Sequence, residues 1–574
     1  MPHAWAMHIS PQAPDAAPSS TGAAPQRGAA AVPDSQGVNF FHADPWGAAM
    51  AQLYLPPELY AHLAPHFSAL GALVGGALDA EAAVADRNPP VLHHRNRRGE
   101  DVQHIEYHPA YLSMTRRAFG DYGFAAMSHR AGVLGWPAPL PPAAKYALTY
   151  LFVQSEFGLM CPVSMTDSLA RTLRRFGTPE LVARYLPALT STDMDTLDQG
   201  AMFMTEQGAG SDISNTAVTA EPAEDGTWRL TGEKWFCSNP DAGVAMVLAR
   251  RGDAPGLKGV SLFLLPRELP DGTQNAYRIV RLKDKLGTRS MASGEISLAG
   301  ATAWLIGEPD AGFRQMADMV NNSRLSNGVR AAGMMRRACA EALFVASRRV
   351  AFGKRLIEMP LMRRQLTKMI MPAEQARSMM FQTAAAMARA DAGDETARKL
   401  LRILTPLIKF RACRDARRVT GDAMEVRGGC GYIEDFGDAR LVRDAHLGSI
   451  WEGTSNIVAL DVLRAAEREA ALPVLIAHAG ELLGNGAPEI RAALGRAEAL
   501  TQAALRNPAL ARQAASALYN ATTAAALHWE STHLPCPARS ALAELVLRHR
   551  LTPRDPLAVT DDTALQDAVL AVAA

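Results

Sequence analysis

The sequence predicts a mainly α-helical protein with a central β domain. Stretches before residue 200 and after residue 311 carry apolar residues at three- and four-residue intervals, as amphipathic helices require. Between residues 201 and 308, short apolar or alternating runs are bounded by Gly, Asp, Asn and Pro, which is typical of strands and turns. Because helices and strands occupy separate blocks, a doubly wound nucleotide-binding fold is not expected.

Five segments are expected along the 574 residues. Residues 1–40 are rich in Pro, Ala, Ser and Gly, which predicts a disordered tail. Residues 41–200 are expected to form an N-terminal helical domain, and 201–308 a middle β domain of six to eight strands. A C-terminal helical bundle domain is predicted for 309–470, followed by an extra C-terminal helical region, rich in alanine, over 471–574.

Composition narrows the class of protein. Hydrophobic residues make up 48% of the chain, and the net charge of +1 argues against a globally basic nucleic-acid binder. Six scattered cysteines without a C-x-x-C pair indicate reduced thiols in a cytoplasmic protein, and we predict no metal site. Neither a charge-free apolar run of membrane-spanning length nor a basic segment ahead of an apolar core is present, so neither a membrane span nor a secretion signal is expected.

Three features of the sequence, the third a pair of stretches, suit the binding of a flat ring or a phosphate. MFMTEQGAGSD (202–212) ends an apolar run in glycines, which let the backbone approach a ligand or simply form a tight turn. GEKWFCSN (232–239) sets aromatic side chains beside a hydroxyl; they could cover a heterocycle or pack on helices. RRVAFGKRL (348–356) and EVRGGCGYIED (425–435) place cations beside glycines, as pyrophosphate binding or an ordinary helix end would.

A fourth stretch, SIWEGTSNI (449–457), contains the lone carboxylate Glu452 directly after Ile450 and Trp451. A charge in apolar surroundings costs free energy unless it is paired or neutralised. Burial raises the pKa of such a carboxyl group toward neutrality, which makes it a usable general base. The alternative is an acid at a helix N-terminus, stabilised by the helix dipole, because a helix start is also plausible from Gly453.

Together these stretches resemble the acyl-CoA dehydrogenase family. TEQGAGSD is similar to the family signature T-E-x-x-A-G-S-D, and KWFCSN to K-x-W-x-T-N, with Phe236 and Ser238 in place of the usual Trp and Thr. LKDKLGTRS, RRVAFGK, GGCGY and IWEGTSNI follow in family order, from about 150 to 465. The finer resemblance is to the AidB (isovaleryl-CoA dehydrogenase-like) branch, through RNPPVLHHRNRRGEDVQHIEYHPAYL, GLMCPVSMT and the extra C-terminal region.

The resemblance implies a middle β-barrel, FAD as the cofactor and a homotetramer in which a neighbouring subunit holds the adenine end of FAD. Arg349 and Phe352, with the two glycines after Arg427, would make that contact, although Glu425 stands where many members have glutamine. The full set of implied cofactor contacts is Met202, Met204, Thr205, Ser211, Phe236, Cys237, Ser238, Arg349, Phe352, Gly428, Gly429, Trp451, Thr454 and Asn456.

The implied activity is that of an oxidoreductase acting on CH–CH groups, the α,β-dehydrogenation of a short or branched acyl-CoA. Glu452 would remove the Cα proton while a hydride leaves Cβ for flavin N5. The Glu452 backbone N–H and an FAD ribityl hydroxyl would stabilise the developing enolate charge. An electron-transfer flavoprotein would be the electron acceptor.

Two further hypotheses remain open. An AidB-type flavoprotein would bind duplex DNA through its C-terminal region, with weak or vestigial dehydrogenase activity. From residue 470 onward eight arginines face nine acidic residues, a net charge of −1, which does not favour a strong DNA contact. The third hypothesis is a flavin-bound scaffold with neither activity.

Overall fold

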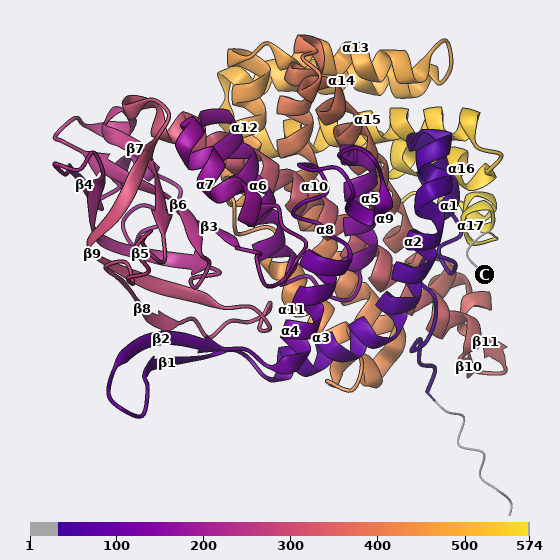
Figure 1. The fold of residues 1–574 in the computed structure, drawn as a ribbon. Coiled ribbons are helices and arrows are strands. Elements are labelled where there is room, and N and C mark those ends of the chain that lie inside the picture. Colours follow the sequence, from indigo (N-terminus) through magenta and orange to yellow (C-terminus); the bar gives the residue numbers. More distant parts are fainter. Residues whose placement is uncertain (1–31, 572–574) are drawn as a thin grey trace, which may run out of the picture.

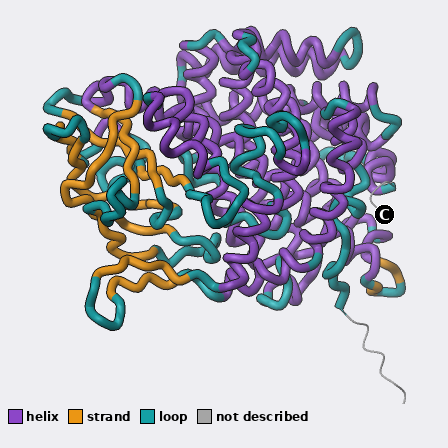
Figure 2. Tube along the Cα trace, viewed as in Figure 1, coloured by secondary structure: helices purple, strands orange, loops and turns teal. Residues whose placement is uncertain are grey.

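The computed structural model describes residues 32–571. Helices make up the larger part of the molecule, and most of the strands gather at one end of it (Figure 1, Figure 2). The predicted class, mainly α with a central β domain, is confirmed.

The N-terminal part is a set of short and medium helices. They are α1 (Gly47–Tyr54), α2 (Pro57–Gly75), α3 (Ala77–Arg87), α4 (Pro109–Thr115), α5 (Pro142–Phe152), α6 (Met160–Phe176) and α7 (Pro179–Leu189). Several begin with proline at N1, where the missing N–H costs nothing. Between α3 and α4, an antiparallel hairpin of β1 (Val91–Arg95) and β2 (Asp101–Glu106) extends below the β domain (Figure 1).

The segment 32–40, predicted as part of the disordered tail, is instead packed on α2. Phe40 is buried, its N–H donates to Gly71 O, and the Gly37 N–H donates to Gly75 O at 2.7 Å. A Cβ on Gly75 would lie 1.7 Å from Val38 O, so glycine is what lets this arm approach the helix. Composition alone missed this pairing because the partner glycines lie more than 30 residues away. Residues 1–31 of the predicted tail lie outside the described residues.

The β domain is a closed sheet. Its seven strands are β3 (Gly200–Phe203), β4 (Thr219–Pro222), β5 (Trp228–Ser238), β6 (Val244–Arg251), β7 (Val260–Pro266), β8 (Tyr277–Leu282) and β9 (Ser293–Ile306). Pairings β3–β5, β5–β9, β9–β7, β7–β6 and β6–β3 complete the ring. Ala201 and Phe203 point into the barrel core, whereas Met202 packs toward the helices, as a period of two requires.

Three long helices form the core of the C-terminal bundle: α8 (Gly312–Arg348), α9 (Pro360–Asp391) and α10 (Glu395–Arg427). A tight hairpin of β10 (Val350–Ala351) and β11 (Lys354–Arg355) joins α8 to α9. Beyond α10 come α11 (Asp438–Leu447) and α12 (Ser455–Arg468). The extra region contributes α13 (Ala471–Leu483), α14 (Pro488–Arg506), α15 (Ala511–His533), α16 (Pro537–Val546) and α17 (Thr563–Leu570).

The extra region is fixed to the bundle by buried ion pairs. Arg539 on α16 is fully buried and lies 2.8 Å from Glu374 on α9 and 3.3 Å from Glu530 on α15. Such pairs demand accurate geometry because each buried charge is costly without its partner. In the described part of the chain no single helix is long and apolar enough to span a membrane; the bent pair α2–α3 passes on length and composition alone.

Candidate active site

Glu452 lies in the loop between α11 and α12, and the bundle fixes the backbone of this loop. Arg324 on α8 donates its Nε–H to Glu452 O at 2.9 Å, and Lys409 on α10 donates to Gly453 O. Glu452 and Gly453 have φ angles of 54° and 97°. A left-handed glutamate costs free energy and persists only where its surroundings impose it, as these two cations do.

The Glu452 carboxylate is buried but only half satisfied. Ser323 Oγ donates to Oε1 at 3.1 Å, whereas Oε2 is buried without a hydrogen-bond partner among residues 32–571. Burial raises the pKa of Glu452, against the opposing charges of Arg324 and Lys409. The helix α12 begins only at Ser455, with Thr454 as its N-cap, so Glu452 is not in the first turn of a helix.

Beside Glu452 lies a plate of two aromatic rings and a guanidinium. The Trp451 and Phe157 rings stack with centroids 5.8 Å apart, and the Arg330 guanidinium carbon lies 4.7 Å and 5.2 Å from their centres. Arg330 is 1% exposed, and no acidic side chain pairs with it in the part of the chain that the structure describes. Its Nη1 and Trp451 Nε1 are buried donors without acceptors there. Buried donors left free in this way indicate an acceptor that the chain itself does not supply.

The strands β3 and β5 carry the next group of predicted contacts. Met202 pairs with Ser238, and the Trp235 N–H donates to Thr205 O at 2.8 Å. Phe236 is 56% exposed, so part of its ring is open, although Lys283 Nζ lies 4.8 Å from the ring centre. By contrast, the Cys237 side chain lies in the barrel core, so any cofactor contact made there would come from its backbone.

Cys161 on α6 lies close to both β5 and Arg330. Its thiol lies close to both the Ser238 hydroxyl and the Arg330 guanidinium. Burial raises the pKa of the Cys161 thiol, and the nearby Glu452 charge adds to that rise. Ser238 at the barrel edge, Arg330 and the Glu452 carboxylate therefore lie near one another around Cys161.

The Gly-rich turn after β3 is held from inside by Glu206. Its carboxylate accepts hydrogen bonds from Lys234 Nζ and the Ala217 N–H, each at 2.7 Å. Both acidic and basic partners are buried, so this pair is structural. The turn itself is open: Ser211 is exposed and Met204 and Thr205 are half-buried. Thr454 and Asn456 are exposed at the start of α12.

The remaining predicted contacts lie elsewhere. Arg349 Nη1 donates to Arg427 O at 3.0 Å, directly before the turn at Gly428 and Gly429, and Phe352 is 98% exposed on the β10–β11 hairpin. Ser323 and Arg348, at the two ends of this stretch of α8, are 25 residues apart, or about 38 Å of helix. A single chain therefore does not bring Arg349 and Phe352 to Glu452.

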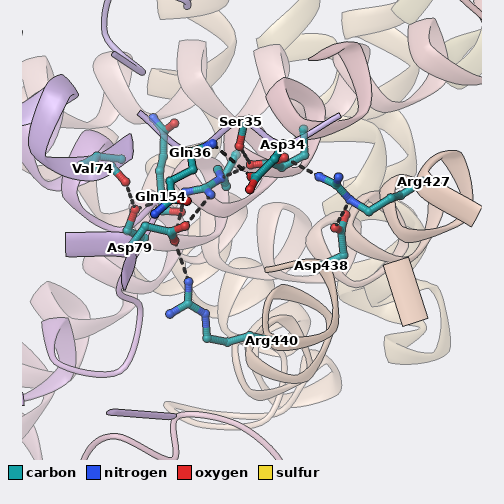
Figure 3. Close-up of polar contacts among 12 residues, drawn as sticks. Asp34, Ser35, Gln36, Val74, Asp79, Gln154, Arg427, Asp438 and Arg440 are labelled. Carbon is teal, nitrogen blue, oxygen red and sulfur yellow. Dashed lines mark hydrogen bonds and ion pairs between the residues drawn. The ribbon is translucent and has the colours of Figure 1, made fainter. Parts of the chain in front are cut away.

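A buried network of ion pairs supports both the Glu452 loop and the turn after Arg427 (Figure 3). Arg427 pairs with Asp438 and Glu341 at 2.6 Å each, and Arg440 pairs with Asp79 on α3 at 2.8 Å. Asp438 and Arg440 belong to α11, whose end leads into the Glu452 loop. The network thus fixes the helix that positions the loop and also supports the turn after Arg427.

Farther along α11, Asp444 accepts a hydrogen bond from the Thr288 N–H at 2.6 Å and ties the helix to the barrel. Burial raises the pKa of Asp444 from its ordinary 3.8 to about 7.

Comparison with known proteins follows the same division of the chain. The "Adaptive response protein AidB N-terminal domain" matches residues 31–196, the "Acyl-CoA dehydrogenase, middle domain" 201–301 and the "Acyl-CoA dehydrogenase, C-terminal domain" 310–467. The chain belongs to the acyl-CoA dehydrogenase family. The predicted resemblance, including its AidB branch, is confirmed.

Individual relatives are similar to this chain over most of its length. The Escherichia coli (strain K12) protein named "Putative acyl-CoA dehydrogenase AidB" is 35% identical over 72% of this chain and 76% of its own. "Acyl-CoA dehydrogenase family member 11" of Caenorhabditis elegans is 32% identical over 75% and 71%. The solved structure of C. elegans ACDH-11 in complex with C11-CoA has a TM-score of 0.85 at 27% identity, covering 93% of this chain and 95% of its own.

Membership of the family implies FAD, and the site fits it. An isoalloxazine ring needs flat apolar walls and hydrogen-bond donors at its polar edge. Phe236 and Trp451 offer the walls, while Arg330 Nη1, Trp451 Nε1 and the Thr205 hydroxyl are donors without acceptors in the described residues. The family match makes the chain an oxidoreductase of this class.

Several site residues lie outside the recognisable sequence motifs. Ser323, Arg324 and Arg330 lie on α8 and Lys409 on α10, all outside the quoted signatures. Arg330 gave one usable signal, because it is a lone cation within the small apolar stretch GVRAAGMM. The others became visible only when the fold placed their helices beside the Glu452 loop.

Proposed function

We propose that this protein is an FAD-dependent acyl-CoA dehydrogenase that oxidises the Cα–Cβ bond of a short or branched acyl-CoA, with Glu452 as the base. The observation that carries the proposal is the Glu452 carboxylate itself. Its pKa is raised by burial, one oxygen is held by Ser323, and the other is buried and free to accept a proton. A positioned carboxylate of raised pKa is suited to general base catalysis near neutral pH.

The backbone supports the second requirement of the reaction, stabilisation of enolate charge. The Glu452 N–H makes no hydrogen bond within residues 32–571, so it is free to donate to the thioester oxygen. Arg324 and Lys409 hold the two following carbonyl groups and fix the direction of this N–H. A preorganised donor is worth far more in a site closed to water than in solution. The hydride acceptor for Cβ would be supplied by bound FAD.

Binding of an acyl-CoA, whatever its chain length, follows from the family and is supported by a relative. C. elegans ACDH-11 was solved in complex with C11-CoA, at 27% identity to this chain. We extend acyl-CoA binding to this protein, and we expect an electron-transfer flavoprotein to reoxidise its flavin.

The deciding experiment is anaerobic titration of the FAD-loaded protein with a panel of acyl-CoA esters, beginning with isovaleryl-CoA. At least one ester should bleach the oxidised flavin spectrum. Glu452→Gln should keep FAD and lose bleaching by about 10²- to 10⁴-fold, the usual contribution of a general base. Glu467→Gln, an equal change of charge on an exposed face of α12, is the matched control. A panel in which no ester bleaches the flavin would refute the proposal.

We also propose that a second copy of the chain completes each cofactor site, within a homotetramer. About 38 Å of α8 separates the Arg349 cluster from Glu452 in one chain. Around Arg349 the surface is unusually apolar: Val350, Phe352 and Tyr432 are 63%, 98% and 82% exposed. Apolar side chains clustered on the surface are typical of an interface. Light scattering of the FAD-loaded protein measures the assembly directly, and a monomer that keeps FAD would contradict this arrangement.

A further inference from the structure

A basic cavity lies on the far side of the bundle from the β barrel, where α16 and α17 pack beside α9 (Figure 1). Its volume is about 220 Å³. Five cationic side chains line it, and one carboxylate, Asp562: the cations are Arg364, Lys368, Arg418, Arg550 and Arg554. They come from α9, α10 and the segment after α16, which are far apart in the sequence.

The single carboxylate of the cavity is already engaged. His549 Nε2 lies 2.8 Å from Asp562 Oδ2, and Arg554 Nη1 lies 2.7 Å from His549 Nδ1. Because Arg554 is always a donor, His549 Nδ1 accepts, the ring is neutral, and its Nε2–H is directed at Asp562. Arg548 also approaches Asp562, at 3.4 Å. The Asp562 carboxylate therefore already has partners in His549 and Arg548.

Four of the five cations lack acidic partners, whereas Arg550 lies 3.9 Å from Asp415. Within residues 32–571 no carboxylate pairs with Arg364, Lys368, Arg418 or Arg554, and Arg418 only donates to Lys368 O at 3.3 Å. Burial and the charges of Arg364, Arg418 and Arg554 lower the pKa of Lys368. All four side chains are exposed, so solvent screens part of their repulsion, and the charge of Asp422 opposes it at Lys368 and Arg418. Positive charges are still in excess here, and an anion with several charges would relieve the repulsion that remains.

We infer that this cavity binds a compact phosphate-bearing anion, of the size of a phosphate or diphosphate group. Arginine forks and a lysine suit tetrahedral oxyanions. Thr367 and Gln566, which also line the cavity, supply neutral polar groups. The volume is below the roughly 300 Å³ at which sites for drug-sized ligands begin, so a single phosphate group or a diphosphate fits better than a large molecule.

The cavity is separate from the proposed dehydrogenase site. Arg418 lies nine residues beyond Lys409 on α10, or about 14 Å along the helix, and ten residues before Gly428. Binding there is therefore expected with or without dehydrogenase activity, and the two can be tested independently.

Calorimetric titration of the FAD-loaded protein with pyrophosphate and with inorganic phosphate tests the inference, with sulfate at matched ionic strength as the comparison. We expect binding of pyrophosphate and a rise in Tm on its addition. Lys368→Gln and Arg554→Gln should each weaken binding at least tenfold, since each removes a charge-assisted contact. Arg506→Gln, which removes an exposed arginine of α14 outside the cavity, should leave binding unchanged.

Stability separates an anion site from a structural cluster. Without added anion, Lys368→Gln should have the same Tm as the parent protein or a higher one, because it relieves repulsion, and it should lose the rise caused by pyrophosphate. A lower Tm with the rise retained would overturn the inference, as would the absence of pyrophosphate binding to the parent protein. Binding of a short DNA duplex that depends on Lys368, without pyrophosphate binding, would assign the surface to nucleic acid instead.

Discussion

The hydrogen bond from Ser323 to Glu452 has a measurable effect on the pH dependence of catalysis. Ser323→Ala removes a donor that favours the ionised carboxylate. A hydrogen bond to a charged group contributes about 1.5–3 kcal/mol, and one pKa unit corresponds to about 1.4 kcal/mol. The pKa of the base should therefore rise by about 1–2 units. Below both midpoints the rate should fall by about 10- to 100-fold, while at high pH the rate of the parent protein should be recovered.

The assay is the second-order rate constant of anaerobic flavin bleaching, measured from low to high pH with the acyl-CoA that bleaches best. The pH dependence of this rate constant reports the pKa of the base in the free protein, in which the hydrogen bond from Ser323 to Glu452 is observed. Ser347→Ala is the matched control, because its hydroxyl donates only to Leu343 O on the same helix. A rate lowered equally at every pH, or an unmoved midpoint, would refute the assigned role of Ser323.

Three more changes test other parts of the site. Phe352→Glu should lower both oligomer mass and FAD content, because it puts a charge into the exposed apolar patch; light scattering and the flavin spectrum measure the two, and full retention of both would contradict the shared site. Asp444→Asn should remove a pH dependence of stability. With a folded pKa of about 7 against an ordinary 3.8, the folded parent protein holds this proton more tightly than the unfolded chain does. The parent should therefore lose up to about 4 kcal/mol of unfolding free energy as pH rises from 4 to 7. Denaturant unfolding at pH 5 and pH 8 measures this change. An equal change in unfolding free energy between the two pH values for both proteins would argue against a raised pKa of Asp444. Asp461→Asn should cost about 3 kcal/mol of stability and slow bleaching, because it leaves Arg324 and Arg402 without their shared carboxylate; denaturation and bleaching measure the two effects, and an unchanged bleaching rate would separate Arg324 from catalysis.

The class of the fold was predictable because it rests on local periodicity. Apolar spacing marks helices such as α8 and α10, and the short runs between glycines and prolines mark the strands. Ring closure was not predictable from that pattern alone, since the β3–β6 pairing joins Met202 to Met246 across 44 residues. The arm at residues 32–40 was missed for the same reason, because its partner is two glycines on α2.

At the site, the signatures located what lies on loops and strand ends, and missed what the helices bring in. Glu452 and Phe236 stand within recognisable motifs. Ser323 is a serine in an ordinary helical sequence, and nothing local distinguishes it from Ser347 on the same helix. Its role depends on the packing of α8 against the loop after α11. The basic cavity shows the same limit: the C-terminal region alone has a net charge of −1, but the fold adds Arg364, Lys368 and Arg418 to it from other helices.

The length of α8 between Ser323 and Arg348 has a consequence for genetics. If each cofactor lies between two copies of the chain, one copy contributes Glu452 to the site and the other contributes Arg349. A mutation of Glu452 in one allele and a mutation of Arg349 in a second allele then damage different halves of the site. Mixed assemblies of Glu452→Gln and Arg349→Gln chains contain some sites built from two intact halves. Two inactive alleles expressed together should then restore part of the activity that neither has alone, whereas a site complete within one chain would allow no such complementation.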